Sequence, residues 1–331
     1  MSQINYKSIP LNTIPSPEDK RDYPISKLVA QVNVFPDQFE IPYNNKIKNQ
    51  GNVCSCVGHS LSYCREITEE KQNKKFFEFS PGFIYANREL NHYQGEGMIP
   101  REALESVKKY GCVVQSVFPF NDDYSALKNK FISKKDYLLK YAYPYRISSY
   151  CRLYTTNEIK NALMQLGAVT ICVPIYESFY NTISNGVVSI PKSNEKLYGY
   201  HEMTITGWRK DNKWITLNSW GGNWGNRGRC YLDFKFPIVE AWSITDDILP
   251  HPEPEPEKQK YWRVQLGAFK NKSNCEKYQK KIFNETGWKS YIVFIDGFYK
   301  LQMNCFINKT NAQNFSKQLK SMGYNNFIVF Y

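Results

Sequence analysis

The chain has 331 residues, a formal net charge of +12 and nine cysteines at irregular spacings. It has no run of about 18 apolar residues, and its N-terminus lacks a charged region followed by an apolar core, so the sequence predicts no transmembrane segment and no secretory signal. The lysines are scattered without an arginine-rich stripe, so we expect no nucleic acid partner; the charge fits a solvated surface or attraction to an anionic cell wall.

The stretch "NQGNVCSCVGHS", Asn49 to Ser60, places two thiols just before a helix-compatible run. Cys56 would occupy the first helical turn, where the partial positive charge of a helix N-terminus stabilises a thiolate. Gln50, six residues earlier, could bring its amide beside that thiol as an oxyanion donor. A metal site of Cys54, Cys56 and His59 would lack a fourth ligand, so we expect no metal and no cofactor. Cys54 is interpreted as a packed or exposed thiol, and His59 as a histidine on the helix surface.

Two segments further along the chain carry a candidate base and its partner. In "YGYHEMTITGW", His201 opens an alternating segment that is typical of a strand. In "WITLNSWGGNWGNRGRCYL", Asn218 ends an apolar strand before a turn rich in glycine and tryptophan. Its amide could hold an imidazole in one tautomer, while Trp220 and Trp224 keep water off that hydrogen bond. Glu202 follows the histidine, and we expect its carboxylate to point away from the imidazole.

Together these motifs resemble the papain family of cysteine peptidases, in the family's order. The segments "FSPGFIYANREL" and "GMIPREALESVKKYGCV" match the helices between the family's two lobes, so the likeness runs roughly from Phe35 to Leu249. It implies a peptide or protein substrate and a substrate strand paired with the backbone around Gly95–Met98. The implied catalytic residues are Cys56 as nucleophile, His201 as base, Asn218 as orienting amide and Gln50 as oxyanion donor; the implied substrate-binding residues are Gly97, Met98, Tyr200 and Trp220.

The chain departs from the family's pattern at three points. Val57 stands where a tryptophan usually follows the nucleophile, and Val53 stands where a disulfide-bonded cysteine is usual. The inhibitory pro-segment is missing, because residues 1–34 are too few for a helical blocking domain. The other cysteines of this region are interpreted as buried small apolar residues: Cys64, Cys112, Cys151, Cys172 and Cys230.

A second region follows the run "LPHPEPEPEKQK", whose alternating proline and glutamate predict an extended linker. After it, "VQLGAFKNKSN" recurs as "LQMNCFINKTN", and "GWKSYIVF" recurs as "GYNNFIVF". Each half reads as strand, helix, strand, with Asn271 or Ser273 capping the first helix and Thr310 the second. The order βαββαβ predicts a four-stranded antiparallel sheet with both helices on one face and the other face open.

This repeat resembles the SPOR (sporulation-related repeat) domain, whose members bind the glycan strands of peptidoglycan. By that resemblance Gln265 and Trp288 are candidate glycan contacts. Each also has a purely structural interpretation: Gln265 as an outward-facing strand residue, and Trp288 as a residue that caps the core. Asn304 and Cys305 stand where the family usually has Gly-Pro.

The sequence therefore predicts an α+β chain, a two-lobed papain-like fold with a helical lobe and a β-barrel-like lobe, followed by a small βαββαβ SPOR domain. The expected boundaries are an N-terminal extension at 1–34, a peptidase domain at 35–249, a linker at 250–260 and the SPOR-like domain at 261–331. The expected function is a cysteine peptidase directed to bacterial cell wall, where it cleaves a protein or peptidoglycan peptides. The alternative is a non-catalytic wall-binding protein. Synthesis in the cytoplasm and action at the wall, a spore or a virion after release are expected.

Overall fold

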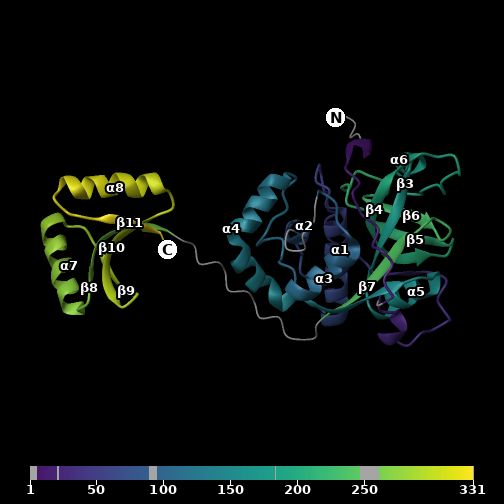
Figure 1. Cartoon of the computed structure of the whole chain (residues 1–331), viewed down its shortest axis with the longest axis horizontal. Coiled ribbons are helices and arrows are strands. Elements are labelled where there is room, and N and C mark those ends of the chain that lie inside the picture. Colours follow the sequence, from purple (N-terminus) through teal and green to yellow (C-terminus); the bar gives the residue numbers. More distant parts are fainter. Residues whose placement is uncertain (1–5, 21, 89–94, 183, 247–260, 331) are drawn as a thin grey trace. The chain divides into compact units, whose positions relative to one another are not determined.

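The computed structural model describes residues 6–20, 22–88, 95–182, 184–246 and 261–330 (Figure 1). The chain divides into two compact units, Met1–Glu253 and Pro254–Tyr331. The predicted linker at 250–260 lies outside the described residues. Among those that are described, no helix combines the length and the apolar character needed to cross a membrane.

The first unit packs a group of helices against one antiparallel sheet. The helices are α1 (Cys56–Asn73), α2 (Pro81–Asn87), α3 (Pro100–Tyr110) and α4 (Tyr124–Ala142). The sheet follows the order β2-β7-β3-β4-β5-β6, with β1 paired to β4. Its strands are β1 (Phe39–Glu40), β2 (Ile147–Leu153), β3 (Val169–Tyr176), β4 (Leu197–Arg209), β5 (Lys213–Leu217), β6 (Arg229–Asp233) and β7 (Glu240–Asp246); α5 (Thr156–Gln165) and α6 (Glu177–Tyr180) accompany them. The 3-10 turns are η1 (Tyr6–Ser8), η2 (Ile25–Lys27) and η4 (Tyr143–Tyr145).

Helix α1 lies between the other helices and the sheet (Figure 1). On one side, the carbonyl of Pro81 would lie 2.8 Å from a Cβ at Gly58, so the absent side chain lets α1 and α2 approach closely. On the other side, Ser60 Oγ lies 2.7 Å from both Thr170 Oγ1 of β3 and Thr204 Oγ1 of β4. The start of α1 is therefore held at the seam between helices and sheet.

The second unit has the predicted order: β8 (Trp262–Phe269), α7 (Lys272–Thr286), β9 (Tyr291–Ile295), β10 (Phe298–Phe306), α8 (Lys309–Ser321) and β11 (Phe327–Phe330). Its four strands form one antiparallel sheet in the order β11-β8-β10-β9. Asn271 caps α7 as predicted, but Asn308 caps α8 by accepting a hydrogen bond from the Thr310 amide, so the second cap lies two residues earlier than predicted. The two-lobed fold and the βαββαβ domain are both confirmed.

Candidate active site

The loop before α1 is built around a tight turn. Gly51 has φ of +54°, a left-handed conformation that favours glycine, and its amide donates to Asn49 Oδ1 at 3.1 Å. The Val53 amide donates to the Gln50 carbonyl at 3.2 Å, and α1 begins at Cys56, as predicted. Cys56 therefore sits in the first turn of a buried helix, where the helix dipole favours a thiolate.

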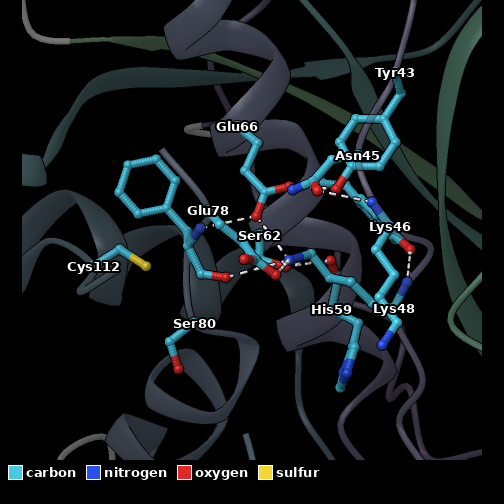
Figure 2. A network of polar contacts seen from close by, with 12 residues as sticks. Tyr43, Asn45, Lys46, Lys48, His59, Ser62, Glu66, Glu78, Ser80 and Cys112 are labelled. Atoms are coloured by element: carbon cyan, nitrogen blue, oxygen red, sulfur yellow. Dashed lines mark hydrogen bonds and ion pairs between the residues drawn. The ribbon is translucent and has the colours of Figure 1, made fainter. Parts of the chain in front are cut away.

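A buried polar network fixes the chain that leads into this loop (Figure 2). Lys48 Nζ lies 2.7 Å from Glu66 Oε1 of α1, and the same carboxylate accepts hydrogen bonds from the Tyr43 hydroxyl and the Phe79 amide. The Lys48 carbonyl accepts from the Gly221 amide at 3.0 Å. The network thus ties the residues just before Gln50 to α1 and to the loop after Asn218.

His201 lies within β4 and Asn218 directly follows β5, and the sheet brings the two side chains together. His201 Nε2 lies 2.8 Å from Asn218 Oδ1, and the Ser219 amide donates to that same oxygen at 2.7 Å. Because Oδ1 already accepts from a backbone N–H, it is the amide oxygen, so Nε2 must carry the hydrogen. The Trp220 ring lies 5.0 Å from the imidazole and both are buried.

The other ring nitrogen of the histidine, Nδ1, is buried and has no hydrogen-bond partner among the described residues. Burial lowers the pKa of His201 from its ordinary 6.5 to about 4, although the hydrogen bond that the imidazole donates to Asn218 opposes that shift. The imidazole is therefore neutral at pH 7 in this state, with a lone pair on Nδ1 available to accept a proton.

The Gln50 side chain is oriented by Ser219, the residue that follows Asn218. Ser219 Oγ donates to Gln50 Oε1 at 2.7 Å, which turns the Nε2 group away from Ser219. Nε2 donates at 3.1 Å to two carbonyls, those of Val53 and Pro10. The amide predicted to serve an oxyanion is thus already bonded to a carbonyl oxygen from the N-terminal extension.

The N-terminal extension passes directly over the candidate nucleophile. Thr13 Oγ1 lies 3.1 Å from Cys56 Sγ, and the Thr13 amide donates to the Tyr200 carbonyl at 3.3 Å. Thr13 thereby bridges the thiol and the residue next to His201. The sequence predicts no blocking pro-segment, because residues 1–34 are too few for a helical one; an extended strand needs far fewer residues, and here it covers the thiol.

The remaining predicted substrate-binding residues also lie against this extension. The Met98 amide donates to the Asn12 carbonyl at 3.1 Å, and a Cβ at Gly97 would come within 3.0 Å of the same oxygen. The Trp220 ring stacks on Tyr6 with ring centroids 6.1 Å apart. The extension therefore occupies the positions that the resemblance assigns to substrate, and their role in substrate binding stays a prediction.

Two neighbours of the nucleophile have surroundings that disfavour catalysis. Cys54 Sγ is buried within 3.1 Å of Glu96 Oε2 and 2.9 Å of Asn12 Nδ2, and burial together with Glu96 raises its pKa to about 12. His59 is only 1% exposed and bonds the Ser55 carbonyl through Nδ1 at 2.9 Å, so its prediction as a surface histidine is wrong. Burial lowers the pKa of His59 to about 3.

All nine cysteines are free, and the five predicted to be buried apolar residues are buried: Cys64, Cys112, Cys151, Cys172 and Cys230. The Glu202 carboxylate accepts from Thr170 Oγ1 at 2.7 Å, on the face of β4 opposite His201, as expected.

The face of the second sheet without helices carries a row of four side chains across its strands. Gln265 of β8 pairs in register with Gln302 of β10, and Gln302 Nε2 donates to Gln265 Oε1 at 3.3 Å. Phe327 of β11 lies beside Gln265, and Tyr291 of β9 lies beside Gln302. The two glutamines are buried, whereas Phe327 and Tyr291 are 54% and 60% exposed.

Trp288 does not belong to this row. Its ring lies 5.2 Å from that of Phe315 in α8, within the core between helices and sheet, so its position favours the structural interpretation over a glycan contact. Asn304, which replaces the family's usual glycine, has φ of +52° and sits at a register shift in β10. The strand thus keeps a left-handed residue at this point without Gly-Pro.

Sequence reasoning missed three residues that shape these sites: Thr13, Ser219 and Gln302. Thr13 has no local signal, because the Cys56 that it contacts is 43 residues away in the sequence. Ser219 follows Asn218 directly, but only the fold shows that its hydroxyl reaches Gln50. Gln302 occupies in the second repeat the place that Gln265 holds in the first, so the repeat itself contained that signal.

Comparisons with known proteins agree with this geometry. The model of the papain family cysteine proteases matches residues 36–236, and that of the SPOR domain matches residues 258–330. An uncharacterized peptidase C1-like protein of Acanthamoeba polyphaga mimivirus is 25% identical over 203 residues, which are 58% of this chain and 65% of the relative. Tubulointerstitial nephritis antigen of Bos taurus is 31% identical over 218 residues, 53% of this chain and 44% of the relative. The chain therefore spans less than two thirds of the length of these relatives.

Solved structures show the same fold. Xylellain, a cysteine protease from Xylella fastidiosa, superposes with a TM-score of 0.64 at 21% identity, over 75% of this chain and all of that one. The cysteine protease and lectin-like domains of Cwp84, a surface layer associated protein of Clostridium difficile, give a TM-score of 0.59 at 15% identity, over 81% and 65% of the two chains.

Proposed function

Because the chain belongs to the papain family of cysteine proteases, we propose that it is a cysteine peptidase, latent in the state described and directed to bacterial cell wall by its SPOR domain. The observation that carries the catalytic part is the buried His201–Asn218 hydrogen bond, which leaves Nδ1 of the imidazole unpartnered among the described residues. The runner-up, a non-catalytic wall-binding protein, gives no reason for this tautomer to be fixed.

In the proposed mechanism, His201 Nδ1 takes the proton of the Cys56 thiol and the thiolate attacks the substrate carbonyl. The resulting oxyanion accepts hydrogen bonds from the Cys56 backbone N–H and Gln50 Nε2. The imidazolium then protonates the leaving amine, and the thioester forms. A water molecule, deprotonated by the same nitrogen, hydrolyses the thioester and restores the thiol.

Latency follows from what the N-terminal extension touches. Pro10 presents its carbonyl to the Gln50 amide, and Thr13 stands between Cys56 and the Tyr200 carbonyl. A substrate carbonyl cannot reach the thiol or the oxyanion donor while these contacts last. Withdrawal or cleavage of the extension is therefore part of the proposed function.

Wall binding is proposed for the row Phe327–Gln265–Gln302–Tyr291 of the SPOR domain, which we call the aromatic row. Exposed aromatic rings offer flat apolar faces to sugar rings, and the buried amide pair between them links the two strands beneath that surface. The substrate is then a protein or a peptide of peptidoglycan held near the wall, spore or virion surface.

The test compares two variants of the chain, each of which lacks one cysteine, after the extension has been cut. Cys56→Ala is expected to abolish both hydrolysis and stoichiometric labelling by a thiol-reactive epoxide, whereas Cys54→Ala keeps most of both, because only Cys56 begins α1. The substrates are denatured protein and purified wall sacculi, with products identified by mass spectrometry. If only Cys54→Ala loses activity, Cys56 is not the nucleophile. If the cut wild-type chain neither hydrolyses a substrate nor reacts with the epoxide, the non-catalytic wall-binding protein is favoured.

A further inference from the structure

His59 is a buried polar side chain near the nucleophile that the proposed mechanism does not use. It lies on α1, three residues after Cys56, and is only 1% exposed. Its ring packs edge-on against Phe120, with ring centroids 4.7 Å apart. Because water does not reach the imidazole, its hydrogen-bond partners must come from the protein.

Ser55, the residue that precedes α1, supplies partners for one of the ring nitrogens. His59 Nδ1 lies 2.9 Å from the Ser55 carbonyl oxygen and 3.2 Å from Ser55 Oγ. A carbonyl oxygen can only accept, so Nδ1 carries the hydrogen and donates it. Burial lowers the pKa of this imidazole to about 3, although the hydrogen bond to Ser55 opposes the shift, so the ring donates as a neutral group at pH 7.

The same carbonyl accepts a second hydrogen bond from the same residue. The backbone amide of His59 donates to the Ser55 carbonyl at 2.9 Å, in the usual pattern of a helix. A carbonyl oxygen has two lone pairs, and His59 supplies a donor to each of them. The Ser55 carbonyl is therefore held from two directions by a single residue.

This carbonyl is one end of the peptide group whose other end is the Cys56 N–H. The peptide group is planar and rigid, so fixing its carbonyl also fixes the direction of its N–H. In the first turn of a helix an N–H has no partner within the helix, which leaves that of Cys56 to meet an oxyanion. Hydrogen bonds in a chain polarise one another, and each strengthens the next by about 10–30%.

We propose that His59 is a positioning residue of the oxyanion hole, which aligns and polarises the Cys56 N–H through the carbonyl of the same peptide group. This inference rests on the proposed peptidase function. His59 acts when the thiolate attacks and negative charge develops on the substrate oxygen. Its Nδ1 keeps its hydrogen throughout, so the proton transfers remain those of His201.

The experiment compares His59→Asn with His59→Leu in the full chain. A site for a specific protease is inserted at Val34, which is 87% exposed, so that the folded protein is cut in place and the extension is released. Asparagine and leucine have the same shape and both lack the ring, but only asparagine brings an N–H group near the place of Nδ1. We expect kcat on a small peptide to be about two- to tenfold lower in His59→Leu than in His59→Asn, a fraction of the loss caused by removing an oxyanion donor, with equal KM.

Melting temperatures separate this effect from a general loss of stability. The asparagine variant buries a side-chain carbonyl that the leucine variant does not have, so it should melt at or below the temperature of His59→Leu. The more active variant is then not the more stable one. Equal kcat in the two variants would assign the role of His59 to packing and overturn the proposal.

Two controls test whether the effect passes through the oxyanion. Alkylation of Cys56 by iodoethane, followed by mass spectrometry, needs the thiolate but forms no oxyanion, so its rate should be equal in the two His59 variants. Ser62→Ala removes a 2.8 Å hydrogen bond to the His59 carbonyl, whose peptide group does not include the Cys56 N–H, and should keep the wild-type kcat. A parallel fall in alkylation, or a loss of kcat in Ser62→Ala as large as in His59→Leu, overturns the proposal.

If no peptide is turned over at all, the proposed function fails and the inference is still tested. NMR of the cut chain with isotope-labelled cysteine gives one amide resonance for each of the nine cysteines, and Cys56→Ser identifies that of Cys56. A hydrogen bond to the Ser55 carbonyl draws electron density from the Cys56 amide, so its nitrogen resonance should lie upfield in His59→Leu relative to His59→Asn. Coincident resonances in these two variants overturn the proposal.

Discussion

At the scale of single residues, the amide of Gln50 is held with its donor group facing the cleft. Ser219 Oγ fixes the carbonyl end of the amide at 2.7 Å, so Nε2 needs no reorganisation to meet an oxyanion. In the chain freed of its extension, Gln50→Ala is expected to lower kcat by about 10²–10³, the usual cost of one oxyanion donor. Steady-state kinetics on a small peptide measure this loss.

Asn218→Ala serves as the comparison for that variant. Asn218 only orients the imidazole, so its loss should be milder than that of Gln50. An unchanged kcat in Gln50→Ala would show that the amide does not serve the oxyanion.

The buried His59 is expected to make the stability of the fold depend on pH, because burial lowers its pKa. Its pKa is about 3 in the folded chain and near 6.5 when unfolded, so the unfolded chain binds the proton first. The stabilisation is complete above pH 6.5 and is lost as the pH falls toward 3, at about 1.4 kcal/mol per pH unit. Urea unfolding of the wild type and His59→Gln at pH 7, 5.5 and 4 measures the difference in unfolding free energy.

His201 and the buried carboxylates titrate in the wild type and in His59→Gln alike. Their contributions to the unfolding free energy therefore cancel in the difference between the two, apart from their coupling to His59. The wild type should therefore lose its advantage over His59→Gln as the pH falls. A difference that stays constant from pH 7 to pH 4 would contradict the prediction.

Single residues were predictable where a local pattern carries the chemistry. The offset from Gln50 to Cys56, the alternating segment at His201 and the strand that ends before Asn218 are local patterns, and the fold brings His201 and Asn218 within 2.8 Å. The contact of Thr13 with Cys56 depends on how an extended segment without any pattern crosses the cleft. No property of residues 1–34 encodes that path locally.

At the scale of elements, helix α1 depends on its buried polar network as much as on apolar packing. Lys48 and Glu66 form an ion pair with both side chains buried, and Glu66 Oε2 also accepts from the Tyr43 hydroxyl. Glu66→Ala leaves the buried Lys48 ammonium with only the Phe79 carbonyl at 3.4 Å and the half-exposed Glu78 carboxylate at 4.0 Å, so a loss of about 3–5 kcal/mol in unfolding free energy is expected. Chemical denaturation and the melting temperature measure it.

Glu78→Ala is the matched control, since Glu78 is half-exposed and its carboxylate is 4.0 Å from Lys48 Nζ. Its unfolding free energy should change by less than about 1 kcal/mol, the usual worth of an exposed ion pair. If the two variants unfold at the same urea concentration, the network contributes nothing to the stability of α1.

The same network explains why the sequence misplaces His59. Polar residues such as Arg65, Glu66 and Glu69 usually mark the solvent face of a helix, and here all three are buried because each has a partner. The position of α1 between helices and sheet leaves its first turns no solvent face. Periodicity therefore predicts the start of the helix and not its surroundings.

At the scale of the whole molecule, the two units were predictable because each has its own pattern. The Pro-Glu run separates the papain-like motifs from the repeat, and each unit contains its own buried core. The repeat also predicted the four-stranded antiparallel sheet through its βαββαβ order, and the structure adds the strand order β11-β8-β10-β9. It did not predict that Trp288 packs on Phe315, because an aromatic residue after a helix fits a core or a surface equally well.

The second unit is expected to bind wall glycan through its aromatic row, independently of the first unit. Because this unit has its own core, residues 1–249 should hydrolyse a small peptide at close to the full-length rate once the extension is cut, and residues 261–331 should pellet with wall sacculi. Amidase treatment, which strips stem peptides from the glycan, should increase pelleting.

Tyr291→Ala and Phe327→Ala should each weaken pelleting of residues 261–331 several-fold, since these exposed rings offer the sugar-stacking surface. Gln265→Ala should weaken pelleting because it breaks the amide pair with Gln302. Phe294→Ala, on the opposite face of β9 and 63% exposed, is the control and should bind as the wild type does. A steep loss of pelleting in high salt would assign the binding to the net charge of +12 acting on anionic wall polymers. Equal pelleting of the Tyr291, Phe327 and Phe294 variants would place the glycan elsewhere on the domain.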